Sequence, residues 1–148
     1  LFKRLAQRFS RDVQIHTRVC PGLVEAVEAG EALTPRTRAR LEACLAPLQT
    51  AGMDQLVLGC THYPFLQTVI QDLIGPKVKV IDPSPAVARQ VGRVLRARCE
   101  VNAPGREGDH TLYTSGLPSD LERLARILVG YDGPARKAQW YNHRLRVA

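Results

Sequence analysis

Residues 55–65 read Gln-Leu-Val-Leu-Gly-Cys-Thr-His-Tyr-Pro-Phe, so a thiol, a hydroxyl and an imidazole directly follow a short apolar run. The run 55–58 is continuous and apolar, which predicts a strand covered on both faces. Pro64 suits the first turn of a helix. We therefore expect Cys60 at the carboxyl end of a parallel strand, where ligands of open α/β sheets collect.

This position suits acid/base chemistry. The start of the following helix offers unpaired N–H groups and a partial positive charge, which attract anions and favour a thiolate. His62 would share a face with Cys60 if the strand continued. Two alternatives remain. A strand cysteine is commonly a small buried hydrophobe, and Cys-x-His supplies two zinc ligands. However, structural zinc takes four ligands and no second ligand pair is present, so no metal is expected.

Strands and helices alternate along the rest of the chain. Predicted strands lie at 13–16, 55–58, 78–81 and 111–114, and predicted helices at about 23–29, 35–49, 64–74, 85–98 and 119–130. Thr34 is the expected cap of the second helix, and Ser119 with Glu122 forms a capping box before the last one. This alternation predicts an α/β fold with a parallel sheet flanked by helices.

The polar, glycine-containing loop 102–109 is the expected domain boundary, which divides the chain into 1–101 and 102–148. Apolar residues at helical spacing occupy 1–9, as though a preceding strand and loop had been cut away. We therefore expect a fragment of a longer α/β protein.

The four cysteines are not clustered, and no secretory leader is recognised, which favours reduced thiols in the cytoplasm. Cys44 falls on an apolar helical stripe and is expected in the core. Cys20 and Cys99 have no neighbouring histidine. No stretch is long and apolar enough to cross a membrane.

The formal charge of +7 permits nucleic-acid binding as an alternative function. Arginines supply two basic helix faces: Arg36, Arg38 and Arg40 on one helix, and Arg89, Arg93, Arg96 and Arg98 on another. Aromatic residues make up only 5% of the chain, and no nucleic-acid-binding module is recognised. Nucleic acid is therefore not the expected main partner.

Four segments resemble bacterial glutamate racemases, of the aspartate/glutamate racemase family, in the same order. Residues 56–66 (LVLGCTHYPFL) resemble the family's second cysteine motif, and the other segments are 19–30 (VCPGLVEAVEAG), 80–84 (VIDPS) and 112–116 (LYTSG). The resemblance covers nearly the whole chain. The family's first half, with its Asp-Ser-Gly and Cys-Asn-Thr segments, does not occur in these residues, and the resemblance implies that 102–148 packs on that half.

The resemblance implies cofactor-independent interconversion of L- and D-glutamate for peptidoglycan synthesis. Two acid/base groups on opposite faces of Cα would move the proton, and Cys60 would be one of them. Thr61 would bind the substrate carboxylate, His62 would assist proton transfer, and Glu28 would orient His62 or face the substrate ammonium. Glutamate would be the partner, no cofactor such as PLP would be required, and the full-length enzyme could be a homodimer.

The resemblance also implies that these residues alone are inactive. Aspartate and hydantoin racemases and related decarboxylases are the nearest alternatives, although they tend to differ at the position of His62. An inactive truncated copy is the remaining alternative.

Overall fold

A computed structural model describes residues 13–103, 105–106 and 108–147. The helix expected within 1–9 lies outside the described residues. The chain divides into two compact units, Leu1–Ile81 (unit 1) and Asp82–Ala148 (unit 2). Parallel strand pairs with helices confirm the predicted α/β class.

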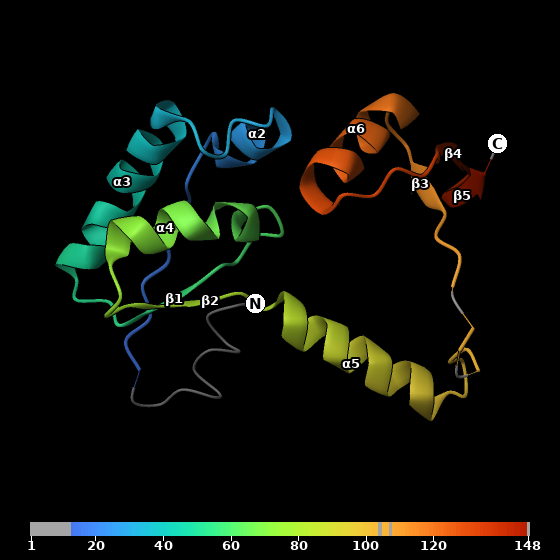
Figure 1. Ribbon diagram of the computed structural model, residues 1–148, viewed down its shortest axis with the longest axis horizontal. Coiled ribbons are helices and arrows are strands. Elements are labelled where there is room, and N and C mark those ends of the chain that lie inside the picture. The colour runs from blue at the N-terminus through green and yellow to red at the C-terminus, as the bar shows by residue number, and fades with distance from the viewer. Residues whose placement is uncertain (1–12, 104, 107, 148) are drawn as a thin grey trace. The chain divides into compact units, whose positions relative to one another are not determined.

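Unit 1 contains three α-helices, one short 3₁₀ helix and two strands in its described part. In chain order they are α2 (Leu23–Glu28), α3 (Pro35–Thr50), β1 (Gln55–Val57), η1 (Tyr63–Leu66), α4 (Gln67–Ile74) and β2 (Lys79–Ile81). The strands β1 and β2 pair in parallel, with Leu56 opposite Val80. Helices α3 and α4 lie side by side in Figure 1, and α4 also contacts β2.

Helix α3 begins where the sequence predicts, because Thr34 caps it. The Thr34 hydroxyl accepts a hydrogen bond from the Thr37 N–H at 3.3 Å, and Pro35 occupies the first turn, where no N–H partner is needed. The buried Thr37 hydroxyl donates to the Glu31 carbonyl at 2.8 Å. The start of α3 is therefore fixed to the loop that follows α2.

The core of unit 1 joins α2, α3 and the η1–α4 segment. Leu23, Val27, Leu41 and Leu66 are each at most 2% exposed, and α2 contacts both α3 and η1. Full burial of such a side chain contributes about 1.5–3 kcal/mol. This core holds α2 against the residues that follow β1.

Unit 2 has a small sheet and few buried apolar side chains. Its elements are α5 (Ser84–Ala97), β3 (Leu112–Thr114), α6 (Pro118–Val129), β4 (Ala135–Tyr141) and β5 (Arg144–Val147). The strand order is β3-β4-β5, parallel for the first pair and antiparallel for the second. Ala125 and Ala138 are its buried apolar residues among those described, and α5 has no buried residue.

Three predictions about unit 1 elements are wrong. Residues 13–16 are exposed and form no strand, because the described sheet of unit 1 contains only β1 and β2. β1 is not covered on both faces, since Val57 is 60% exposed. The helix expected from Pro64 is instead the 3₁₀ helix η1 followed by α4, which starts at Gln67.

The predicted capping box of α6 is also wrong. Helix α6 begins one residue earlier, at Pro118, and its N-cap Leu117 provides no side-chain hydrogen bond. The Glu122 carboxylate instead accepts a hydrogen bond from the Ala135 N–H at 2.9 Å, at the start of β4. The predicted end of α6 at Gly130 is confirmed by its left-handed conformation, φ 67°.

The expected domain boundary at 101/102 falls inside unit 2, because α5 groups with the residues that follow it. The division into 1–101 and 102–148 therefore stays a proposal.

Candidate active site

The turn that follows β1 presents Cys60. The Leu58 N–H donates to the Ile81 carbonyl at 3.0 Å and so extends the β1–β2 pairing by one bond, and Leu58 is 2% exposed. The chain then reverses, with the Tyr63 N–H donating to the Cys60 carbonyl at 3.2 Å. Buried Leu58 and Leu66 anchor the two sides of this turn, which leaves Cys60 partly exposed between them.

Cys60 and His62 lie close together, although the turn interrupts the strand. The Cys60 Sγ is 3.9 Å from the His62 Nδ1, within the range for a hydrogen bond to sulfur. The Thr61 hydroxyl oxygen is 3.4 Å from the same nitrogen. Thr61 itself is exposed. The Cys60 and Thr61 side chains therefore both lie beside the same ring nitrogen of His62.

The second ring nitrogen of His62 contacts a carboxylate from another element. The His62 Nε2 is 3.0 Å from the Glu28 Oε1, and the two side chains are 28% and 45% exposed. Glu28 is the last residue of α2, and the burial of Leu23 and Val27 on that helix places it beside the turn. The structure thus brings all four predicted site residues together.

This arrangement can move a proton. With its proton on Nε2, in a hydrogen bond to the Glu28 carboxylate, the neutral imidazole has Nδ1 free to accept a proton from the Cys60 thiol. With both ring nitrogens protonated, the imidazolium can return a proton to the sulfur. A thiol, an imidazole and a carboxylate in this order form an acid/base chain.

Tyr63 lies at the same site, and the sequence pattern assigned it no role. Its hydroxyl donates to the Cys20 carbonyl at 3.3 Å. Burial raises the pKa of Tyr63 above its ordinary value, the nearby Cys60 adds to the rise, and the hydrogen bond to Cys20 opposes it. The only sequence signal was its place inside the Gly-Cys-Thr-His-Tyr-Pro segment.

The prediction of four unpaired cysteines is wrong for two of them. Cys20 and Cys44 form a disulfide, with their Cα atoms 5.8 Å apart, whereas Cys60 and Cys99 are free. The burial predicted for Cys44 is confirmed, at 8% exposed. The pairing has a physical cause, because packing of α3 beside the segment before α2 brings two cysteines that are 24 positions apart within bonding distance.

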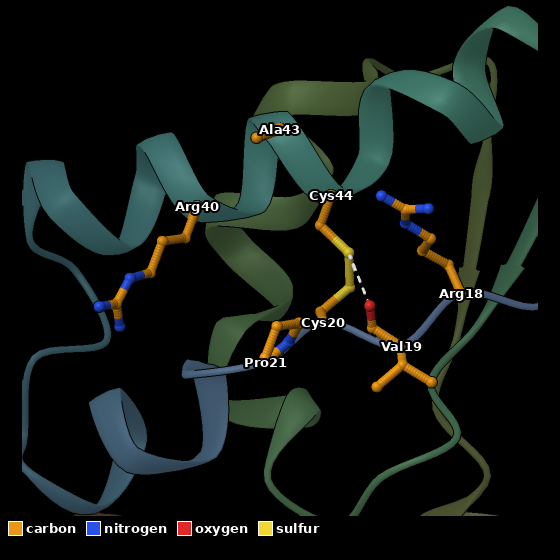
Figure 2. A pocket seen from close by; sticks show the side chains of 7 residues that line it. All are labelled: Arg18, Val19, Cys20, Pro21, Arg40, Ala43 and Cys44. Atoms are coloured by element: carbon orange, nitrogen blue, oxygen red, sulfur yellow. Dashed lines mark hydrogen bonds between the residues drawn. A yellow bond between two sulfur atoms is a disulfide. The ribbon is translucent and has the colours of Figure 1, made fainter.

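A pocket of about 250 Å³ surrounds this disulfide and does not include the acid/base residues. Its lining residues are Arg18, Val19, Cys20, Pro21, Arg40, Ala43 and Cys44. Figure 2 shows the Arg18 and Arg40 side chains on opposite sides of the disulfide, with the Arg40 guanidinium pointing away from it. The Arg40 group also donates to the Gly22 carbonyl at 3.0 Å. The two arginines therefore do not converge on a common anion.

The described residues contain neither a metal-binding cluster nor a membrane-spanning helix. Within them, no group of three or more histidine, cysteine or acidic side chains is arranged to hold a metal ion. None of their helices combines the length and apolar character that crossing a membrane requires.

The fold and the site together define an α/β domain that carries a cysteine–histidine–carboxylate acid/base chain after a parallel strand. Residues 2–91 match the family described as Asp/Glu/Hydantoin racemase. The chain belongs to this family.

Known proteins similar to this chain are about twice as long as the matched region. A glutamate racemase of Pseudomonas aeruginosa (strain UCBPP-PA14) is 49% identical over 129 residues, which cover 87% of this chain and 48% of that protein. A crystal structure of a glutamate racemase isoform from Bacillus anthracis matches with a TM-score of 0.83 at 25% identity, covering 93% of this chain and 52% of that one. A glutamate racemase from Thermus thermophilus, solved in complex with β-chloro-D-alanine, matches with a TM-score of 0.74 at 29% identity, covering 90% and 52%. The chain spans about half the length of the curated relatives it matches.

Proposed function

We propose that this chain carries one of the two acid/base centres of a cofactor-independent amino-acid racemase acting on glutamate. The observation that supports this most is the hydrogen-bonded chain from Cys60 through His62 to Glu28. Removing a proton from Cα needs a base that can also act as an acid, and a thiol beside an imidazole meets both requirements.

The proposed reaction moves one proton on each face of the substrate. On one face, the Cys60 thiolate takes the Cα proton and becomes a thiol, while the electron pair left on Cα is delocalised into the substrate carboxylate. A second acid on the opposite face then donates a proton to Cα, which inverts the configuration. In the reverse direction the Cys60 thiol donates and returns to a thiolate.

Each neighbour of Cys60 has a proposed role in this cycle. His62 assists proton movement at the sulfur through Nδ1, and Glu28 orients the ring through Nε2. The Thr61 hydroxyl is exposed and donates to the substrate carboxylate. The Thr61 hydroxyl oxygen lies 3.4 Å from the His62 Nδ1 and is therefore beside the nitrogen that assists the proton transfer.

Glutamate as the substrate rests on the relatives, whose names state glutamate racemase at up to 49% identity. The product D-glutamate would serve peptidoglycan synthesis, in the cytoplasm, with no PLP and with a homodimer as one assembly of the full-length enzyme. The Cys20–Cys44 disulfide counts against this location, because cytoplasmic thiols are normally kept reduced.

The second acid/base group would come from outside these 148 residues. Neither Cys99 nor the Cys20–Cys44 pair has a histidine partner among its described contacts, and the family's Cys-Asn-Thr segment is absent from the sequence. We therefore expect no turnover from this chain alone. An aspartate or hydantoin-type racemase and an inactive truncated copy are the alternatives.

A two-half protein tests the proposal. It consists of this chain with its own upstream coding sequence or, where that lacks a Cys-Asn-Thr segment, with the first half of the Pseudomonas aeruginosa relative. Circular dichroism follows racemisation of L- and D-glutamate, with both aspartate enantiomers and a hydantoin as competing substrates and without added PLP. Cys60→Ser should lower turnover at least about 10³-fold, whereas Cys99→Ser, at the exposed free cysteine, should leave it unchanged.

The expected result is racemisation of glutamate by the two-half protein and none by the 148-residue chain. Faster turnover of aspartate or a hydantoin would replace the proposed substrate. Normal turnover by Cys60→Ser would remove Cys60 from the mechanism.

A further inference from the structure

The acid/base chain depends on two segments that are far apart in the sequence. Cys60 and His62 lie on the turn after β1, whereas Glu28 ends α2, 34 positions before His62. A hydrogen bond of 3.0 Å between His62 and Glu28 forms only when the turn and α2 keep a fixed separation. Any further bond between these two segments therefore controls the geometry of the site.

The Tyr63 side chain makes such a bond. Its hydroxyl donates to the Cys20 carbonyl at 3.3 Å, so it links the residue next to His62 with the chain just before α2. The Tyr63 N–H also closes the turn by donating to the Cys60 carbonyl at 3.2 Å. One residue thus holds the turn closed through its backbone and ties it to the α2 side of the site through its side chain.

The acceptor of this bond is itself well anchored. Cys20 is joined to Cys44 of α3 by the disulfide, and Arg40 of the same helix donates to the Gly22 carbonyl at 3.0 Å. Two bonds from α3 therefore fix the segment 20–22, from which α2 starts at Leu23. A tether to Cys20 transmits this fixed position to the turn.

The environment of Tyr63 keeps its hydroxyl as a donor. Burial raises the pKa of Tyr63, and a negative charge on the neighbouring Cys60 raises it further. The phenol therefore remains protonated at neutral pH when the Cys60 sulfur is ionised.

We propose that Tyr63 is a positioning residue, whose hydroxyl bond to the Cys20 carbonyl holds the Cys60–His62 turn at the distance from α2 that the His62–Glu28 bond requires. This role rests on the proposed function where turnover is concerned. It makes a separate claim about Cys60 that can be measured on the 148-residue chain itself.

Tyr63→Phe removes only the hydroxyl and keeps the ring. Tyr131→Phe is the matched control, since the Tyr131 hydroxyl also donates to a backbone carbonyl, that of His110 at 2.9 Å, within unit 2. Thermal melting of both variants checks that each remains folded.

The first measurement is the rate of iodoacetamide alkylation of the 148-residue chain at neutral pH, resolved by peptide mass spectrometry. Tyr63→Phe should slow alkylation of Cys60 about threefold, because the imidazole is less often beside the sulfur to accept its proton. The exposed Cys99 is the internal reference and should keep its rate. Tyr131→Phe should change neither.

The second measurement is turnover in the two-half protein. Tyr63→Phe should lower kcat about tenfold while KM changes less than about twofold, since misplacement of the acid/base chain affects the reaction more than binding. If Tyr63→Phe matches Tyr131→Phe in both measurements, the proposal is overturned. If no form racemises an amino acid, the proposed function fails, whereas slower alkylation of Cys60 in Tyr63→Phe still supports the tether.

Discussion

Unit 1 and unit 2 use similar elements but bury very different side chains. In the described residues, unit 1 buries leucine, valine and isoleucine from α2, α3 and α4, whereas the buried apolar residues of unit 2 are Ala125 and Ala138. Unit 1 also contains the disulfide and the acid/base chain. Groups that must hold 3–4 Å distances need neighbours locked by packing, and unit 1 provides them.

Unit 2 exposes a stripe of apolar side chains along one of its helices. Val87, Val91 and Val94 follow helical spacing on α5 and are 60%, 52% and 37% exposed. Such a stripe on an otherwise basic helix is typical of a surface that another protein segment covers. Unit 1 therefore contains the acid/base residues in a packed environment, whereas unit 2 exposes an apolar surface. A change made in one unit should affect that unit alone.

Reduction of the disulfide should give the largest effect, confined to unit 1. Opening a closed loop of this size should lower the stability of unit 1 by about 3 kcal/mol. Hydrogen exchange with and without a phosphine reductant measures this, and peptides from unit 2 serve as the control. Thiol titration of the unfolded chain should rise from the free Cys60 and Cys99 to all four cysteines on reduction. Equal acceleration of hydrogen exchange in both units would contradict the claim that the disulfide stabilises unit 1 alone.

His62→Ala should be the next largest effect. In the two-half protein, we expect kcat to fall about 10²-fold with little change in KM, because general acid/base assistance is lost. His110→Ala is the control from unit 2, where His110 is exposed and packs edge-on to Tyr131. An unchanged kcat for His62→Ala would assign its ring to packing alone.

We expect the 148-residue chain to self-associate through the exposed apolar stripe of α5, and Val91→Glu should weaken this association about tenfold because it places a charge in the stripe. Arg93→Gln makes the same change in net charge on α5 but outside the apolar stripe, and should have little effect. Sedimentation velocity over a concentration series measures both. A chain that is monomeric at all concentrations would show that the stripe does not mediate association.

Glu122→Ala should give the smallest effect, about 1 kcal/mol, since it removes one hydrogen bond to the Ala135 N–H. Hydrogen exchange should accelerate in β4 and leave unit 1 unchanged. Acceleration at α2 or at the turn after β1 would show that the two units are coupled.

The sequence predicted local features well, because they depend on neighbouring residues. Thr34 with Pro35 fixed the start of α3, and Gly130 fixed the end of α6. The approach of His62 to Cys60 was expected from their spacing of two residues, although the turn after β1, and not a continuing strand, brings the two side chains together. The contact between Glu28 and His62 was predicted only from the family resemblance, since no local sequence pattern connects positions so far apart.

The features that could not be predicted depend on packing between distant segments. The Cys20–Cys44 pair and the Tyr63 tether both arise where α3, α2 and the turn after β1 meet. The expected strand at 13–16 has suitable residues but pairs with no strand in the described part of unit 1. One missed local signal was the two-residue turn Asn142-His143 between β4 and β5, whose positive φ values fit a type I′ hairpin.

The most direct test of the central claim is exchange of the Cα hydrogen of glutamate in deuterium oxide, followed by proton NMR for each enantiomer separately. With the two-half protein and with Cys99→Ser, both enantiomers should exchange. With Cys60→Ser, exchange should stop for the one enantiomer whose Cα hydrogen faces position 60, and racemisation should be lost. Exchange of both enantiomers at the original rates by Cys60→Ser would contradict the claim that this sulfur carries the proton.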